Sequence, residues 1–192
     1  MIKELLEKYP YTGTGLKVET LELLLGCLLK TKEVEGDIIE MGCANGETSI
    51  YLERIIQAVM PHKKLHLYDS FQGLPEPSEY DGGHFKKGQM RCSKESVVKR
   101  FERIPEIHEG WFEEQEYPDK ISFAFLDGDF YESILVSLQK VYPRLSKGGI
   151  ITIHDYTKDT LPGVEKACSE FFKNKLFCLN NLAIHENNNI SI

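Results

Sequence analysis

The feature that most constrains the fold of this chain is a regular alternation of short apolar segments with amphipathic ones. The apolar segments, several of which end in glycine or an acid, span 36–42, 64–70, 106–112, 121–129 and 148–156. Residues at helical spacing occupy 17–31, 47–60, 93–104, 131–145 and 162–174. Apolar strands that alternate with helices are typical of a parallel sheet covered on both faces. We therefore predict an α/β, Rossmann-like doubly wound fold.

A closing hairpin completes the predicted sheet. Two short apolar runs flank Asn180 and Asn181 within residues 176–186, which is the pattern of two strands joined by a tight turn. With these two strands we expect a mostly parallel, seven-stranded sheet. No linker or repeat divides the chain, so we expect one domain over 1–192, with a helical N-terminal segment over 1–35 and a Rossmann-like core over 36–192.

Composition narrows the classes of partner. Lys and Arg total 23 and Asp and Glu total 30, a net charge of −7, and an acidic chain without a basic stripe is a poor candidate for binding nucleic acid. The apolar patch at 21–29 is too short to cross a membrane, so it packs either on the core or on a second subunit of a homo-oligomer. Five scattered cysteines form no CxxC pair, which argues against disulfides and zinc. We expect a cytoplasmic protein.

A glycine-containing turn follows the first apolar segment. It reads Glu40-Met41-Gly42-Cys43-Ala44-Asn45-Gly46 and leads into a helical segment. Glycines let a ligand approach the backbone, and a helix N-terminus offers free N–H groups. The pattern is not a full GxGxxG, and the acid before the first glycine suits the ammonium of an amino-acid-like ligand instead. A tight turn without a ligand explains the same residues equally well.

The second apolar segment ends at Asp69. A carboxylate in this position can accept both hydroxyls of a ribose, and the alternative is a helix cap or a solvated acid. Residues 71–92, rich in Pro, Gly and Glu, follow as a long connection. This segment is either a lid that uses Tyr80, His84 and Phe85 or a disordered loop.

The last two parallel segments also end in polar residues. Asp127 and Asp129 follow one of them, and His154 and Asp155 follow the other. In the strand order 3-2-1-4-5 these segments are neighbours about 5 Å apart, so the side chains face one small volume. Two carboxylates and an imidazole can hold Mg²⁺, and Asp129 is then a candidate general base for a substrate hydroxyl. His154 alone is as readily a packed histidine as a ligand.

Together these motifs resemble the macrocin O-methyltransferase (TylF) family. The stretches that carry the resemblance are YT (11–12), GDIIEMGCANGETS (36–49), YDSFQGLPEP (68–77), EGWF (109–112) and FLDGDFYES, YPRLSKGGIITIHDY and PGVEKA within 125–167. They keep their order over most of the chain, and DSFQGLPEP and LDGDFYES are the most specific of them. The family often reads Asp-Asp-Tyr where this chain reads His154-Asp155-Tyr156.

The resemblance implies an S-adenosylmethionine-dependent O-methyltransferase that modifies a hydroxyl of a sugar or a natural-product-like small molecule, with help from Mg²⁺. The implied metal ligands are Asp127, His154 and Asp155, and the implied catalytic residues are Asp129 and His154. The implied cofactor-binding residues are Glu40, Gly42, Cys43, Ala44, Gly46, Asp69, Ser70, Phe71, Gly110, Trp111 and Asp127.

Three other functions stay open at this stage. The first is a metal-independent methyltransferase of the same fold that acts on nitrogen or on a protein side chain, with His154 as its base. The second is an inactive cofactor-binding homologue, against which the retention of Asp127, Asp129 and Asp155 argues. The third is a nicotinamide-dependent oxidoreductase, which the incomplete glycine pattern disfavours.

Overall fold

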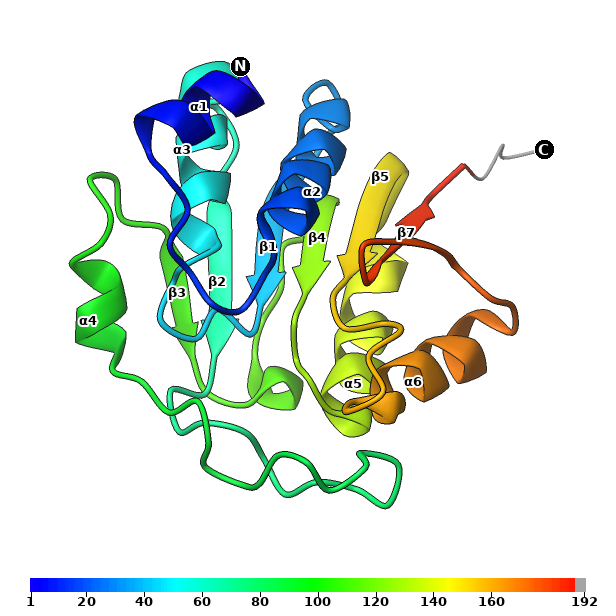
Figure 1. Ribbon diagram of the computed structural model, residues 1–192. Helices are drawn as coiled ribbons and strands as arrows, with labels where there is room; N and C mark the ends of the chain where they lie inside the picture. The colour runs from blue at the N-terminus through cyan, green and yellow to red at the C-terminus, as the bar shows by residue number, and fades with distance from the viewer. Residues whose placement is uncertain (189–192) are drawn as a thin grey trace.

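The computed structural model describes residues 1–188 and contains one seven-stranded sheet (Figure 1). Its strands, in the order in which they lie side by side, are β3 (Glu106–Glu109), β2 (Leu65–Asp69), β1 (Asp37–Met41), β4 (Ile121–Leu126), β5 (Leu145–Ile153), β7 (Leu182–Glu186) and β6 (Phe177–Leu179). The first five are parallel, and β7 pairs antiparallel with both β5 and β6. This arrangement confirms the predicted fold class and the 3-2-1-4-5 order.

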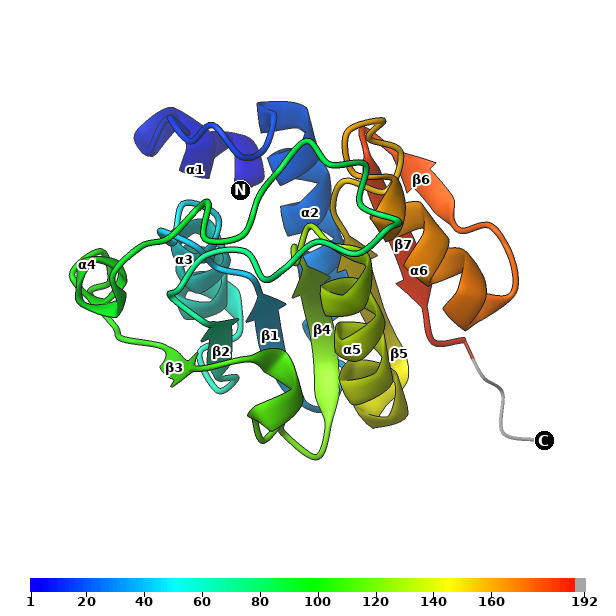
Figure 2. The same cartoon turned by 90° about the horizontal axis from the view of Figure 1, so that it is seen from below.

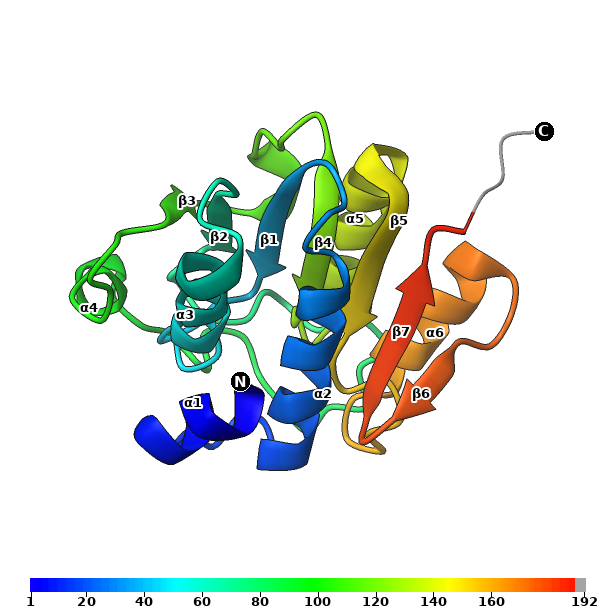
Figure 3. The same ribbon diagram turned by 90° about the horizontal axis from the view of Figure 1, so that it is seen from above.

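Helices cover both faces of the sheet, as Figures 2 and 3 show. On one side lie α1 (Ile2–Lys8), α2 (Val18–Lys30) and α3 (Ser49–Val59), and on the other lie α5 (Tyr131–Val141) and α6 (Pro162–Phe172). The short α4 (Lys94–Val98) lies beyond the β3 edge. Because central strands such as β4 are buried on both faces, the sheet has a separate core on each side.

The two cores meet at the strands, where neighbouring residues face opposite sides. In β1, Ile38 belongs to the core under α2 and α3, and Ile39 to the core under α5 and α6. Four leucines of α2 spaced i, i+3, i+4 and i+7 are fully buried in the first core: Leu21, Leu24, Leu25 and Leu28. The apolar patch at 21–29 therefore packs on this chain's own core.

The helix predicted over 93–104 is wrong in its length. Its start is confirmed, because the Ser93 hydroxyl accepts a hydrogen bond from the backbone N–H of Ser96. It ends at Val98, where the backbone tightens into i→i−3 bonds and Phe101 N–H donates to the Val98 carbonyl. This change buries Phe101 in the core under α2 and α3 before the chain enters β3.

Other boundaries differ for local reasons. The predicted helix 131–145 ends at Val141 because Pro143 follows in a 3₁₀ turn, η2 (Tyr142–Arg144), and β5 then begins earlier than predicted. The strands predicted over 121–129 and 148–156 end at Leu126 and Ile153, so their acids lie in turns. A second 3₁₀ turn, η1 (Phe112–Glu114), ends the segment predicted as strand 106–112. Helix α1 lies within the N-terminal segment 1–35 that was predicted to be helical, and none of its residues is buried.

The carboxyl ends of the parallel strands meet at one edge, at the bottom of Figure 1. The segment that joins β2 to α4 runs beneath this edge. In the part of the chain that the structure describes, no helix combines the length and apolar character needed to cross a lipid bilayer. The fold thus presents its turn residues at one place, where parallel α/β sheets bind their ligands.

Candidate active site

A cavity of about 460 Å³ lies at the carboxyl edge of the sheet, and we call it the carboxyl-edge cavity. Its lining comes from the turns after β1, β2 and β4, from the start of α5, and from residues 73–76, Met90 and 111–113 of the connecting segments. A larger open hollow of about 810 Å³ lies at the amino ends of the strands, around His66 and Tyr117. None of the sequence-predicted site residues lines that hollow, so the carboxyl-edge cavity is the candidate active site.

The glycine turn is held against the exit of β4. Gly42 has a positive φ of 88°, and a Cβ atom on it would lie 2.1 Å from the carbonyl oxygen of Asp127. A larger residue would push these two turns apart. Ala44, at φ 42°, aims its N–H at Oδ2 of Asp69 over 2.8 Å. Glycine is thus required here because the two turns that line the cavity are in contact.

Asp69 joins the glycine turn to the segment that follows β2. Its Oδ1 accepts a hydrogen bond from Phe71 N–H at 2.7 Å while its Oδ2 accepts from Ala44 N–H. Burial raises the pKa of this carboxyl, and the backbone N–H donors act in the opposite direction. An ionised carboxylate has about four lone-pair sites, so two backbone donors leave capacity for ligand hydroxyls on the cavity side.

Glu40 is a buried carboxyl behind the glycine turn. It is 1% exposed, and its Oε2 has no hydrogen-bond partner among the described residues. Burial, together with the charges of Asp127 and Asp69, raises the pKa of Glu40 to about 8. A positively charged ligand would supply the missing partner, because it would stabilise three neighbouring carboxylates at once. This local charge pattern fits the ammonium and sulfonium of S-adenosylmethionine.

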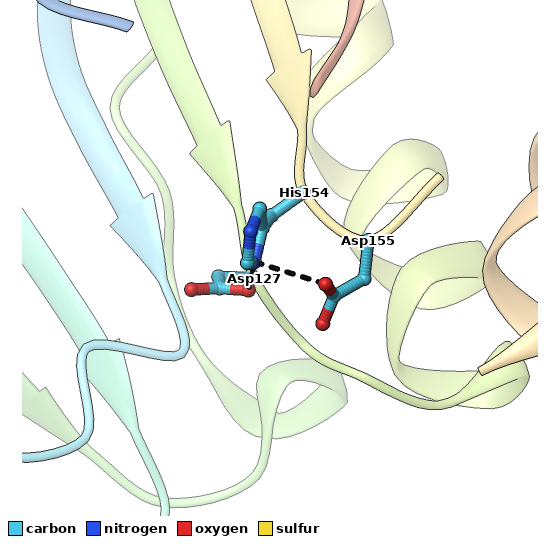
Figure 4. Close-up of side chains that lie close together, drawn as sticks. All are labelled: Asp127, His154 and Asp155. Carbon is cyan, nitrogen blue, oxygen red and sulfur yellow. Dashed lines mark hydrogen bonds and ion pairs between the residues drawn. The ribbon is translucent and has the colours of Figure 1, made fainter. Parts of the chain in front are cut away.

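The ends of β4 and β5 bring together Asp127, His154 and Asp155, which we call the acid–histidine cluster (Figure 4). His154 Nδ1 lies 2.9 Å from Oδ1 of Asp127 and 3.5 Å from Oδ1 of Asp155. One potential ligand atom from each residue falls within 4.8 Å of the others. The two strands thus place all three side chains together, as the sequence predicted.

His154 is charged in this environment. Burial alone would lower the pKa of the imidazole, but Asp127 and then Asp155 outweigh it and raise the pKa to about 9. Burial raises the pKa of the Asp155 carboxyl, and the charge of His154 acts in the opposite direction. At neutral pH the cluster therefore contains an imidazolium between two carboxyl groups.

Two residues that the sequence did not single out also bind Asp155. Lys158 Nζ lies 3.1 Å from its Oδ2, and Asn181 Nδ2 donates to its Oδ1 over 3.0 Å. Asn181 in turn accepts from the N–H and hydroxyl of Thr157. Lys158 follows Asp155 by three positions, and in a turn this spacing predicts an ion pair only weakly. Asn181 comes from the β6–β7 turn, and its role depends on the pairing of β7 with β5, which no local pattern indicates.

Asp129 lines the same cavity as Asp127 of this cluster. It adopts a positive φ of 59°. Burial, then Asp127 and Asp155, raise its pKa well above the ordinary range. The preceding Gly128 packs closely on α5, because a Cβ there would lie 2.9 Å from Cβ of Ser133. A turn with a positive φ thus contributes a second acid to the cavity lining, two positions after Asp127.

The 71–92 segment forms a structured wall of the cavity. Asp81, 1% exposed, accepts from Tyr131 N–H at the start of α5 through Oδ1, and from Ser78 through Oδ2, each over 2.7 Å. Leu74 exchanges backbone hydrogen bonds with Gly88 and Gln89. Residues 73–76 and Met90 line the cavity, whereas the predicted lid residues Tyr80, His84 and Phe85 do not.

The predicted cofactor residues divide into two sets. Those that line the cavity are Gly42, Ala44, Asp69, Ser70, Trp111 and Asp127. Those that do not line it are Glu40, Cys43, Gly46, Phe71 and Gly110. Members of the second set shape the turns: Cys43 and Phe71 are buried in the core under α2 and α3, and Gly110 N–H donates to the Asp69 carbonyl. Lining residues that sequence reasoning missed are Gly73, Leu74, Pro75, Glu76, Met90, Phe112, Glu113, Gly128, Glu132, Ser133 and Val136.

Solved structures with the same fold are methyltransferases. The O-methyltransferase NovP superposes with a TM-score of 0.77 at 23% identity, covering 90% of this chain and 81% of that one. The calicheamicin methyltransferase CalS11 superposes with a TM-score of 0.72 at 20% identity, covering 96% and 89%. At these identities the likeness establishes the fold alone.

Comparison with known sequences identifies the family of this chain. A tetracenomycin-C rhamnosyl 4′-O-methyltransferase of Streptomyces olivaceus is 29% identical over 78% of this chain and 64% of its own length. The demethyldecarbamoylnovobiocin O-methyltransferase of Streptomyces niveus is 29% identical over 74% and 62%. The chain thus spans less than two thirds of the length of these relatives. The family model described as macrocin-O-methyltransferase (TylF) matches residues 11–182, so the chain belongs to this family.

Proposed function

We propose that this protein is an S-adenosylmethionine-dependent O-methyltransferase that methylates a hydroxyl of a small molecule, a sugar or a natural-product-like acceptor. One observation carries the proposal: the glycine turn with Asp69 and the acids Asp127 and Asp129 bound the same cavity. A methyl donor bound by the glycine turn and Asp69 would lie within reach of an acceptor bound by Asp127 and Asp129. Short-range alignment of donor and acceptor is the main requirement of methyl transfer.

The cofactor side of the cavity is assigned as follows. Asp69 accepts the ribose hydroxyls with the lone pairs that Ala44 and Phe71 leave free. Glu40 lies behind the glycine turn, where a positively charged ligand in the cavity would favour its ionised form, and Trp111 packs on the adenine. Membership in the TylF family supports this assignment.

The acceptor side is assigned to the acid–histidine cluster and Asp129. Two carboxylates and a neutral imidazole are a donor set that fits Mg²⁺, with Asp127, His154 and Asp155 as its ligands, and binding would require His154 to lose its proton. When bound, the ion would lower the pKa of an acceptor hydroxyl. Asp129 would accept the hydroxyl proton once bound positive charge offsets burial and the charges of Asp127 and Asp155, which together keep its pKa high. His154 is a poorer base at neutral pH because its own pKa is about 9.

The negative charge of the cavity lining limits which classes of acceptor can bind. Six acids line it, and among the described residues no Lys, Arg or His does: the acids are Asp69, Glu76, Glu113, Asp127, Asp129 and Glu132. A phosphorylated acceptor would face uncompensated repulsion there. A neutral polyol or an amine-bearing acceptor fits this lining better, and apolar walls at Leu74, Met90 and Val136 suit a partly hydrophobic skeleton.

The proposal is tested by titrating S-adenosylhomocysteine into the purified protein by calorimetry, followed by transfer of a labelled methyl group to hydroxylated sugars with and without EDTA. We expect a dissociation constant on the order of micromolar and transfer that EDTA abolishes. Absence of binding contradicts the methyltransferase assignment. Transfer that persists in EDTA contradicts the metal assignment and favours a metal-independent reaction.

A further inference from the structure

A lysine outside the acid–histidine cluster is paired with one carboxylate of that cluster, Asp155. Both oxygens of Asp155 are occupied, Oδ2 by Lys158 Nζ at 3.1 Å and Oδ1 by Asn181 Nδ2 at 3.0 Å. Asp155 itself is nearly buried, with a side chain 4% exposed. A divalent ion that binds this carboxylate therefore shares it with these two donors or replaces one of them.

Lys158 is the donor that can leave at lower cost. Asn181 is fixed on its other side, because its Oδ1 accepts from both the N–H and the hydroxyl of Thr157. The Lys158 side chain is 37% exposed, and among the described residues Asp155 is its only hydrogen-bonded or ion-paired partner. A flexible, strongly hydrated ammonium at a partly open position loses little when water replaces its partner.

The ring of Phe85 offers the Lys158 ammonium a second partner. Lys158 Nζ lies 5.9 Å from the ring centroid of Phe85, within the range of a cation–π contact. Phe85 belongs to the 71–92 segment that walls the cavity. This ring remains available to the ammonium when Lys158 leaves Asp155.

We propose that Lys158 is an internal counter-cation that pairs with Asp155 when no metal is bound and competes with the divalent ion for this carboxylate. The inference rests on the proposed function, since it concerns the metal assigned above. Lys158 balances the charges of the cluster while no metal is bound, and it weakens metal affinity as a consequence. Removing its charge should therefore strengthen cation binding.

The experiment measures Mn²⁺ binding by electron paramagnetic resonance in the presence of S-adenosylhomocysteine, without any activity readout. The variants are Lys158→Met, which removes the charge, and Lys158→Arg, which keeps it. Lys120→Met is the matched control, because Lys120 pairs with Glu35 over 2.7 Å at the opposite end of the sheet. We expect the Mn²⁺ dissociation constant to fall about tenfold in Lys158→Met, the order of one charge-assisted contact. Lys158→Arg and Lys120→Met should stay within about twofold of the unmodified protein.

Several results would overturn the inference. Unchanged affinity in Lys158→Met means that the ammonium does not compete, and weaker affinity means that it positions Asp155 for the metal instead. Absence of Mn²⁺ binding in every form, with S-adenosylhomocysteine still bound, also rejects it. Failure to bind S-adenosylhomocysteine in the unmodified protein rejects the proposed function itself, and calorimetry distinguishes that case.

Discussion

Glu40 shows how one buried side chain connects the fold to the ligand. It is the residue before the last one of β1, it is buried with Oε2 unpartnered among the described residues, and its pKa of about 8 lies above the ordinary 4.5. A carboxyl with a raised pKa binds more protons in the folded state than in the unfolded state. Its stabilising effect is therefore complete below pH 4.5 and disappears as the pH rises to about 8.

Substitution of Glu40 by Gln should flatten the pH dependence of stability. The unliganded protein should lose stability between about pH 4.5 and 8, and Glu40→Gln should remove part of that slope, because the amide does not ionise. Urea unfolding at intervals across this window measures the effect. His154, whose pKa of about 9 is also raised, contributes a slope of the same sign above pH 6.5, which should persist in Glu40→Gln. Identical slopes in both proteins would contradict the prediction.

Asp69 should be the residue on which cofactor affinity depends most. Asp69→Ala removes the ribose contacts and leaves the N–H groups of Ala44 and Phe71 without their acceptor, so affinity for S-adenosylhomocysteine should fall about 100-fold. Asp69→Asn keeps one acceptor oxygen and should lose less. Circular dichroism establishes that the variants are folded, and calorimetry measures the affinity. Near-normal affinity in folded Asp69→Ala would exclude the ribose role.

The convergence of site residues was predictable only where chain geometry requires it. Asp127, His154 and Asp155 follow neighbouring parallel strands, so their proximity follows from strand order alone. The contact of Asn181 with Asp155 spans 26 positions and depends on an antiparallel strand whose register is set by tertiary packing. Sequence periodicity contains no information about such a contact.

At the scale of elements, Asp81 decides whether the 71–92 segment is a wall or a loose loop. Asp81 caps α5 from outside the helix by accepting from Tyr131 N–H, and it also binds Ser78. A capping acid placed 50 positions away from the helix that it caps joins two elements that the chain order keeps apart. The sequence left lid and disorder equally open because this contact is non-local.

Asp81→Ala should release the wall. We expect a loss of about 1–2 kcal/mol in the free energy of unfolding and faster cleavage by trypsin at the exposed Lys86 and Lys87. Asp81→Asn retains an acceptor oxygen for Tyr131 and should be cleaved more slowly than Asp81→Ala. Equal cleavage rates in Asp81→Ala and the unmodified protein would show that the segment is held by other contacts.

Elements with strong periodicity were predicted well, and those that depend on packing were not. Helix α2 follows a leucine pattern that alone specifies its buried face. Helix α4 has a valid cap at Ser93, but it unwinds after Val98 because Phe101 must reach the core. At this position the burial of Phe101 outweighs the local helix propensity.

At the scale of the whole molecule, the sheet couples two cores into one unit. Leu24 of α2 and Leu138 of α5 are both fully buried, on opposite faces of the same strands. Leu24→Ala and Leu138→Ala should each cost about 2–5 kcal/mol, because each opens a cavity. Both should lower the midpoint of one shared unfolding transition, whereas the exposed Val18→Ala should change it little. Separate transitions by circular dichroism and by Trp111 fluorescence would mean that the two layers unfold independently.

The turn between β6 and β7 makes the order of synthesis matter. Asn180 accepts from the hydroxyl of Thr20 on α2, and Asn181 holds Asp155, so this turn joins an early helix to the acid–histidine cluster. A nascent chain leaves the ribosome from its N-terminus. Glu40, Asp69 and the glycine turn therefore emerge well before the amide that fixes Asp155. During translation, these cofactor-side residues have therefore been synthesised before Asn181, which the acid–histidine cluster needs to fix Asp155.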